Sequence, residues 1–141
     1  MTRSIQDTGL AIKRLQMQHH RAANAALAAI DITLVQWDAL RHLDQHPDAS
    51  QHDLAQLTFQ TDQSFGALAA RMEVRGLIKR VDGPGRAVRH RLTAKGKRLR
   101  EQGGALMEQV LQRSFEPLTA QQLATLDGLL QLLVIEPVGP S

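Results

Sequence analysis

Small and apolar side chains recur at helical spacing through the first thirty residues. They fall near steps of three, four and seven and comprise Ile5, Ile12, Leu15, His19, Ala22, Ala26 and Ile30. This spacing places side chains on one face of a helix and predicts a single helix over 5–30. A helix of that length cannot bury its stripe against a small domain alone. We therefore infer that it packs against a second subunit.

A second helix is expected to begin after Thr33. Thr33 and Gln36 have the spacing of a capping box, in which each side chain bonds to the backbone N–H of the other residue. Trp37 lies on or beside the apolar face of this helix. Core packing is the favoured interpretation of Trp37, and the wall of a ligand pocket is the alternative. The side chains expected to point inward are Val35, Ala39, Leu40 and Leu43.

Two short helices separated by a turn follow. Ser50 can cap the first, and either Thr61 or Asp62 can cap the second. Gly76 suits the left-handed position that ends a helix. The apolar stripe of the first helix is Leu54, Ala55 and Leu57, and that of the second is Phe65, Leu68, Ala69 and Met72.

A basic hairpin is expected next, with strands over 77–81 and 88–92 around the turn residues 82–85. Alternation places His90 on one face of the second strand and Arg89 and Arg91 on the other. Two helices meeting at a turn, followed by a basic two-stranded hairpin, form a winged helix-turn-helix pattern.

The last third of the chain predicts two more helices. Thr93 caps the first, where Gly103 and Gly104 favour a kink or a close crossing, and Pro117 ends it. Thr119 opens the second with another capping box. Its apolar residues are Leu123, Leu126, Leu129, Leu130, Leu133 and Val134. So much leucine on a terminal helix favours burial in a dimer.

The predicted fold is therefore mainly α with a small β-hairpin wing: a winged helix-turn-helix with N- and C-terminal dimerisation helices. We assign 1–30 to the N-terminal dimerisation helix, 31–100 to the DNA-binding domain and 101–141 to the C-terminal dimerisation helices. The 141 residues form one compact unit in this interpretation.

Composition and charge narrow the function. The absence of cysteine excludes disulfides and thiolate metal sites. Neither a signal peptide nor a membrane-spanning run is visible, so we expect a cytoplasmic protein. The net charge is only +3, but residues 71–100 hold eleven Lys or Arg against two acids. This excess of positive charge lies on the winged unit and favours a polyanionic partner.

Four segments, in order and spacing, resemble the MarR family of transcriptional regulators. They are 32–43, 50–56, 71–78 and 86–96. The resemblance implies a homodimer of winged helices whose terminal helices form the interface. It also implies small, often phenolic or anionic, ligands bound between those helices and the winged unit.

One departure from the family pattern lies in the wing. The family usually has Asp-Arg-Arg-Ala there, and Arg86 occupies the place of the second arginine. Pro84 replaces the acid and Gly85 the first arginine. Arg86 therefore lacks its usual acidic partner and is either more mobile or paired with Asp82.

The second helix of the winged unit is expected to enter the major groove of duplex DNA, and the wing the minor groove. Gln63 suits adenine, and Arg71 suits guanine or phosphate. The helix that begins at Ser50 is expected to contact phosphate through side chains and backbone N–H groups. The DNA-binding candidates are Ser50, Gln51, Thr61, Gln63, Ser64, Ala67, Arg71, Arg86, Arg89 and Arg91.

A small aromatic or anionic effector is the second expected partner. The candidates for its pocket are Met17, His20, Trp37 and Arg41, although packing or exposure explains each of them more simply. His42 and His46 could share a metal, but no carboxylate is evident beside them, so no metal and no cofactor are predicted.

We also expect no enzymatic activity, because the sequence holds no catalytic triad order, no phosphate-binding glycine loop and no isolated carboxylate pair. The predicted function is a dimeric DNA-binding repressor or activator, with repressor favoured, that binds a pseudo-palindromic operator and is tuned by a small ligand. The alternative is a winged-helix interaction module that does not bind specific DNA.

Overall fold

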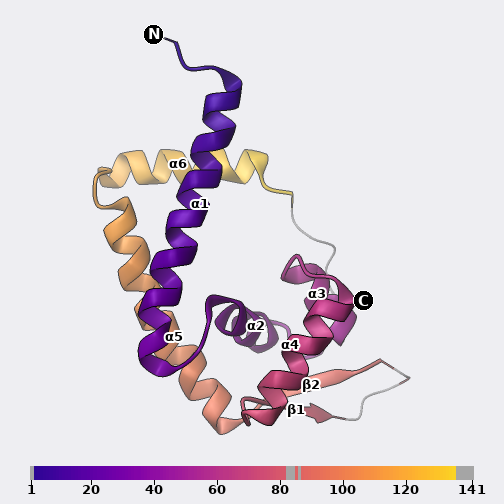
Figure 1. Ribbon diagram of the computed structural model, residues 1–141. Coiled ribbons are helices and arrows are strands. Elements are labelled where there is room, and N and C mark those ends of the chain that lie inside the picture. The colour runs from indigo at the N-terminus through magenta and orange to yellow at the C-terminus, as the bar shows by residue number, and fades with distance from the viewer. Residues whose placement is uncertain (1, 82–84, 86, 136–141) are drawn as a thin grey trace.

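The computed structural model describes residues 2–81, 85 and 87–135, and in this part of the chain the fold is mainly helical with one hairpin (Figure 1). The helices are α1 (Ile5–Leu27), η1 (Ala28–Ile30, a 3-10 turn), α2 (Leu34–Gln45), α3 (Gln51–Leu57), α4 (Asp62–Val74), α5 (Ala94–Phe115) and α6 (Ala120–Leu133). The strands β1 (Ile78–Val81) and β2 (Arg89–Leu92) are antiparallel. The predicted fold class is confirmed.

Side-chain caps begin the helices where the sequence predicts them. The capping boxes of Thr33 with Gln36 and of Thr119 with Gln122 are both formed. At α4 the cap is Thr61, whose Oγ1 accepts from the backbone N–H of Ser64 at 3.0 Å. These caps satisfy N–H groups that a helix start leaves without a partner.

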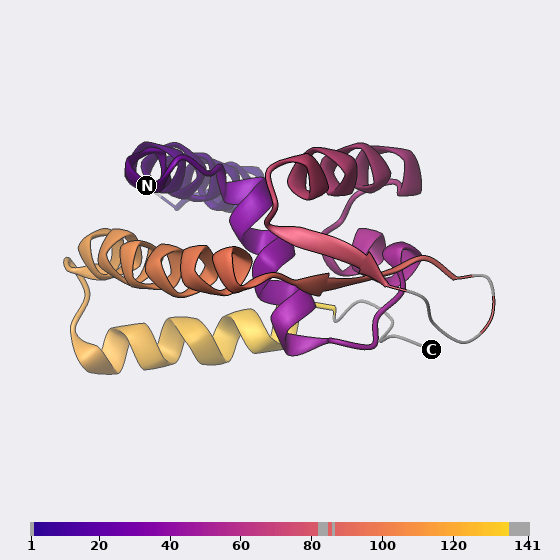
Figure 2. The ribbon, with the colours of Figure 1, turned by 90° about the horizontal axis from the view of Figure 1, so that it is seen from below.

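The winged unit, α2 to β2, has its own core. Leu40, Leu54, Met72 and Leu77 are fully buried within it. Figure 2 shows β1 and β2 beside α4, with β2 leading toward α5. The other edge of β2 pairs with the chain at Ser50, where the backbone N–H of Gln51 donates to the carbonyl of Val88 at 2.7 Å.

The helices α1 and α5 pack side by side and carry the winged unit at one end (Figure 1). Gly103 permits this arrangement, because a Cβ there would lie 2.8 Å from Nε1 of Trp37. The indole N–H of Trp37 donates to the carbonyl of Arg100 at 3.0 Å. The helix α5 continues through Gly103, so the glycine serves a close crossing and not a break.

The face of α1 that this chain buries holds Ala23 and Leu27, which lie outside the stripe that is predicted to face a second subunit. Two details of the predicted helices are wrong. The first helix ends at Leu27 and tightens into a 3-10 turn over Ala28–Ile30, where one helix over 5–30 was predicted. Val35, expected to point inward, is 41% exposed because the first turn of α2 lies at the mouth of a cavity described below.

Candidate nucleic-acid interface and effector pocket

The helix α4 is held firmly and presents one side to solvent. Gly76, with φ of 73°, ends it in the left-handed region, and Thr61 begins it. Its buried side is the predicted stripe, Phe65, Leu68, Ala69 and Met72. The residues that lie opposite this stripe are exposed and comprise Gln63, Ala67, Ala70 and Val74. Gln63 and Ala67, both predicted to face DNA, therefore lie together on the outer face of α4.

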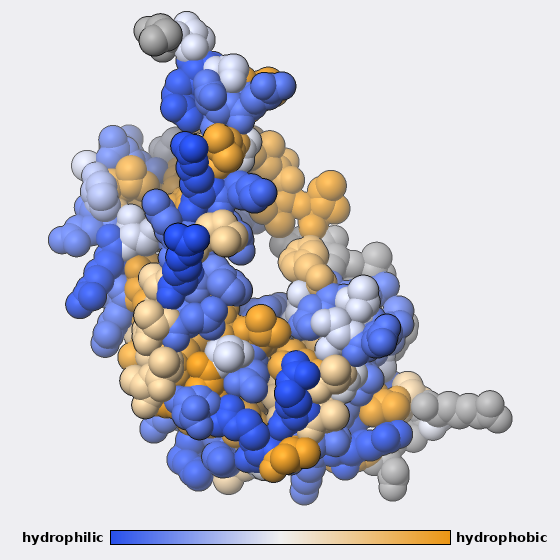
Figure 3. All heavy atoms as spheres, in the orientation of Figure 1, coloured by the Kyte–Doolittle hydropathy of each residue, from blue (hydrophilic) through white to orange (hydrophobic). Residues whose placement is uncertain are grey.

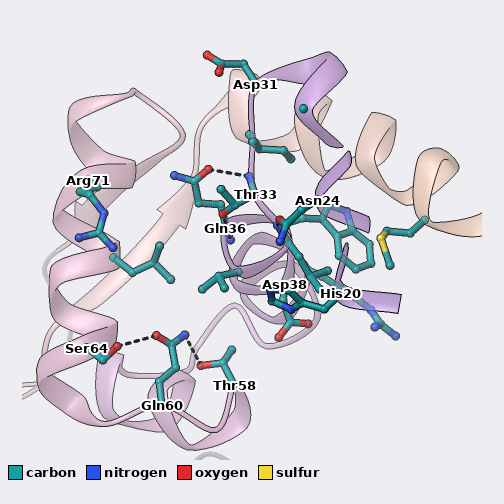
Figure 4. A pocket seen from close by; sticks show the side chains of 18 of the residues that line it. His20, Asn24, Asp31, Thr33, Gln36, Asp38, Thr58, Gln60, Ser64 and Arg71 are labelled. Atoms are coloured by element: carbon teal, nitrogen blue, oxygen red, sulfur yellow. Dashed lines mark hydrogen bonds between the residues drawn. The ribbon is translucent and has the colours of Figure 1, made fainter. Parts of the chain in front are cut away.

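Two other predicted DNA-contacting residues lie on a different side of α4. Ser64 and Arg71 line a cavity between α4, α2 and α1, together with Leu68 and Arg75 (Figure 4). The hydroxyl of Ser64 donates to Oε1 of Gln60 at 3.2 Å. Both residues are exposed as well, so this flank of α4 borders the cavity and the outer face at once.

The acid in the first turn of α4 has a partner on α3. Nδ1 of His52 lies 2.7 Å from Oδ1 of Asp62, and both side chains are exposed. Because a carboxylate only accepts hydrogen bonds, the imidazole is the donor. The ring thus covers part of the negative charge of Asp62 in the first turn of α4.

The start of α3 offers less to phosphate than expected. The backbone N–H of Ser50 donates to Oδ2 of Asp53 at 3.0 Å, and that of Gln51 donates to Val88. These two N–H groups serve the fold, so the predicted backbone contact is wrong for them. Their side chains are half-buried, and that of Gln51 reaches Gly66 of α4, where an added Cβ would lie 3.1 Å from its Nε2.

The hairpin carries several cations. Lys79 lies directly opposite Arg91 across the two strands, and both are exposed. Like charges in this position repel and lower the stability of a hairpin, which an anionic partner would offset. Arg89 is half-buried, and its Nη1 is buried without a partner among the described residues. Arg86, Asp82 and Pro84 lie outside the described residues, and so does the predicted wing-tip contact.

A buried histidine that the sequence analysis left unassigned joins the hairpin to α4. His90 is 2% exposed, and its Nε2 lies 2.9 Å from Oε1 of Glu73. Burial lowers the pKa of His90, while the hydrogen bond to Glu73 opposes that change. The alternation of β2 places His90 inward, but sequence alone does not show which acid meets it.

The cavity has a volume of about 1280 Å³ and opens between α1 and the winged unit (Figure 3). His20, Trp37 and Arg41 line it, as predicted for an effector pocket. Met17 does not, which corrects that prediction. The residues of α1 that line the cavity are Gln16, His20 and Asn24, at i, i+4 spacing, and Met17 lies about 100° away from Gln16. Trp37 is also a core residue, so both interpretations of it apply.

Of the charged residues that line the cavity, two arginines are available to bind an anion. Arg75 lies 3.4 Å from Oδ2 of Asp31. Asp38 raises the pKa of His42 through a side-chain contact between Nδ1 and Oδ1 at 3.3 Å. The guanidinium of Arg41 lies 5.6 Å from the centre of the Trp37 ring. Within the described part of the chain, neither Arg41 nor Arg71 has a carboxylate partner, so the cavity favours an anion.

The two histidines considered for a metal stack instead. The rings of His42 and His46 lie 6.5 Å apart at an interplanar angle of 15°. Asp38 is the carboxylate that the sequence analysis missed, one turn before His42. Across residues 2–81, 85 and 87–135, no three metal-binding side chains come together.

The comparisons with known proteins agree with this architecture. The model of the MarR family matches residues 30–87. A MarR family protein of Mycobacterium tuberculosis, in complex with salicylic acid, is 26% identical over 94% of this chain and 98% of its own, with a TM-score of 0.76. Residues 30–87 therefore match the MarR family, and the fold is that of its winged-helix proteins. Members of this family regulate transcription and are not enzymes.

Other MarR structures share the fold. A mutant of MarR from E. coli complexed with operator DNA is 24% identical over 90% of this chain and 93% of its own, with a TM-score of 0.82. A MarR family regulator from a Rhodococcus species is 22% identical over 94% of this chain and 96% of its own, with a TM-score of 0.84. No curated protein matches the chain by sequence. Among the described helices, none is both long and apolar enough to cross a membrane.

Proposed function

We propose that this MarR family protein is a dimeric, cytoplasmic repressor that binds a pseudo-palindromic operator. The observation that carries the proposal is the combination of an exposed outer face on α4 with cations on the adjoining hairpin. In this arrangement α4 enters the major groove and the hairpin follows the backbone into the minor groove. The relative of the same fold that was crystallised with operator DNA supports this assignment.

The proposed DNA contacts are of two types, contacts to base edges and contacts to the backbone. Gln63 is the base-reading side chain, because its amide can donate to N7 and accept from N6 of adenine. Lys79, Arg91 and Arg89 pair with phosphates, and Arg86 reaches the minor groove. Arg71 can contact either the DNA backbone or an effector, because it borders both surfaces.

Dimerisation would supply a second α4 helix for the second half-site of the operator. The helix α6 has no buried residue, although it is rich in leucine, and Leu132 is 81% exposed. Apolar side chains gather at its C-terminal end (Figure 3). A second copy of the chain would cover them and place two α4 helices about one helical turn of DNA apart, near ~10 bp.

The cavity is the proposed effector site. Its available cations, Arg41 and Arg71, and the ring of Trp37 suit a small aromatic acid. Salicylic acid in the relative from M. tuberculosis is such a molecule. Because Arg71 and Arg75 of α4 line this cavity, an anion bound there would shift α4 relative to α1 and release the operator.

The test begins with DNA fragments selected from a random pool by the purified protein. Anisotropy titrations against the selected site should show log affinity falling with log salt by roughly 0.9 per phosphate contact. Gln63→Ala and Arg86→Ala should each weaken binding, and salicylate should release the DNA. A flat salt response, or unchanged binding by both variants, would favour the alternative of an interaction module that does not read DNA.

A further inference from the structure

The outer face of α4 has an unusual composition for a helix that reads bases. Along this face one residue, Gln63, has a side chain that can form hydrogen bonds. The next two positions outward are alanines, Ala67 and Ala70, and both are exposed. Beyond the first turn this face therefore presents the methyl groups of the two alanines and, at the end of the helix, the side chain of Val74.

Two polar neighbours of this face are engaged within the fold. Ser64 donates to Gln60, and Asp62 meets His52 at 2.7 Å. Arg71 is available, but it lies on the flank that borders the cavity and not on the outer face. On the outer face itself, sequence discrimination past the first turn of α4 therefore falls to apolar contacts.

Only one feature of the major groove gains from an apolar contact. Thymine presents a C5-methyl group there, whereas guanine and cytosine present hydrogen-bonding groups that alanine cannot pair. Resting on the proposed function, we propose that Ala67 and Ala70 read thymine methyl groups and that Gln63 reads an adenine in the same half-site. The ligand class is thus an A·T-rich half-site.

The spacing along α4 fits consecutive base pairs. A rise of 1.5 Å per residue puts Ala67 about 6 Å and Ala70 about 10.5 Å from Gln63 along the axis. Base pairs are about 3.4 Å apart. The two methyl groups would therefore reach thymines roughly two and three steps from the adenine, on either strand. The small side chains also let the helix backbone approach the bases closely.

The experiment replaces each thymine of the selected half-site with deoxyuridine, one position at a time. Uracil keeps the pairing and the minor-groove edge and loses only the methyl group. The wild-type protein should bind about fourfold more weakly at each methyl that it contacts, the value expected for one buried methyl group. Minor-groove positions under the wing should show no change.

Two variants assign the contacts. Ala67→Gly should abolish the uracil penalty at one position and Ala70→Gly at another, while each keeps the penalty at the remaining position. The penalty is a ratio of two affinities of the same protein, so any loss of folded protein caused by glycine cancels. Each variant thus serves as the matched control for the other.

The outcomes separate this inference from the proposed function. Failure of the protein to select any DNA would overturn both. Selective binding with no uracil penalty, or a selected half-site without thymine, would overturn only the methyl-reading assignment. A penalty that persists in both glycine variants would show that other residues contact the methyl groups and would likewise overturn it.

Discussion

The winged unit and α6 are both rich in leucine, yet they bury it to opposite extents. In the winged unit Leu40 and Leu54 are buried, and the hairpin, α3 and α4 pack around them. In α6 no leucine is buried, and Leu132 and Leu133 are 81% and 67% exposed. The winged unit therefore completes its own core, whereas α6 requires a surface from another molecule.

This difference follows from topology. Residues 34–92 place three helices and two strands around a common centre, so each apolar stripe meets another within the same chain. The helix α6 follows α5 through a short turn and lies on the other side of α5 from α1 (Figure 2). An apolar stripe there has no partner of its own, which makes self-association the natural way to remove it from water.

The largest expected effect comes from charging the exposed leucines of α6. Leu132→Glu combined with Leu133→Glu should convert the dimer to a monomer, because a C2 dimer suffers each substitution twice. At about 1.5–3 kcal/mol per buried leucine, the loss is on the order of 6 kcal/mol or more. Sedimentation equilibrium measures it, and helical content by circular dichroism should stay unchanged.

The control for this variant is Gln131→Glu, which changes the charge of α6 at an exposed polar position. It should remain dimeric. A wild-type protein that sediments as a monomer at tens of micromolar would contradict the claim that α6 buries its leucines against a second copy of the chain.

The next effect in size concerns the core of the winged unit. Leu40→Ala should lower the free energy of unfolding by about 2–5 kcal/mol, because it leaves a cavity among residues that cannot collapse fully. Urea denaturation measures the change. Val35→Ala, on the same helix but 41% exposed, should cost clearly less. Equal losses for the two variants would show that the face of α2 assigned to the core is wrong.

Two residues on α4 sharpen the distinction between its outer face and its cavity flank. Gln63→Ala should weaken operator binding by about 1–3 kcal/mol, the usual value of a bidentate base contact. It should leave salicylate binding unchanged. Arg71→Ala should weaken salicylate binding by about 1.5–3 kcal/mol, the value of a hydrogen bond to a charged group. Calorimetry with salicylate and anisotropy with DNA separate the two, and identical profiles would refute the division.

The smallest effect is the pH dependence of the link between hairpin and α4. Burial lowers the pKa of His90 below its ordinary value of 6.5, against the opposing hydrogen bond from Glu73. The unfolded chain therefore binds more protons at this site, and stability falls as pH drops below about 6.5. His90→Leu should lose less stability than the wild type between pH 7 and pH 5, measured by urea denaturation at each pH.

The contribution of His42 to the pH dependence of stability has the opposite sign. Asp38 raises the pKa of His42, so its contribution is present in full at low pH and is lost as pH rises through the raised value. His42→Ala should therefore show a steeper acid-side loss than the wild type. Identical slopes in all three proteins would show that neither histidine contributes to the pH dependence.

Much of the fold could be predicted from sequence. The side-chain caps at Thr33, Thr61 and Thr119, the left-handed Gly76 and the buried stripe of α4 are local features. Each depends on hydrogen bonds or spacings within a few residues, so the sequence alone determines them. The family and the winged architecture followed from the order of such features along the chain.

The contacts between segments that lie far apart in the sequence were decided only by the tertiary structure. The pairing of His90 with Glu73, the turning of Ser64 and Arg71 toward a cavity and the choice of Ala23 and Leu27 as the buried face of α1 all depend on how elements rotate against one another. A helix with small or polar residues on several sides fits more than one rotation at similar local energy. Packing against α2 and α5 removes that freedom, because only one rotation fills the space that those helices leave.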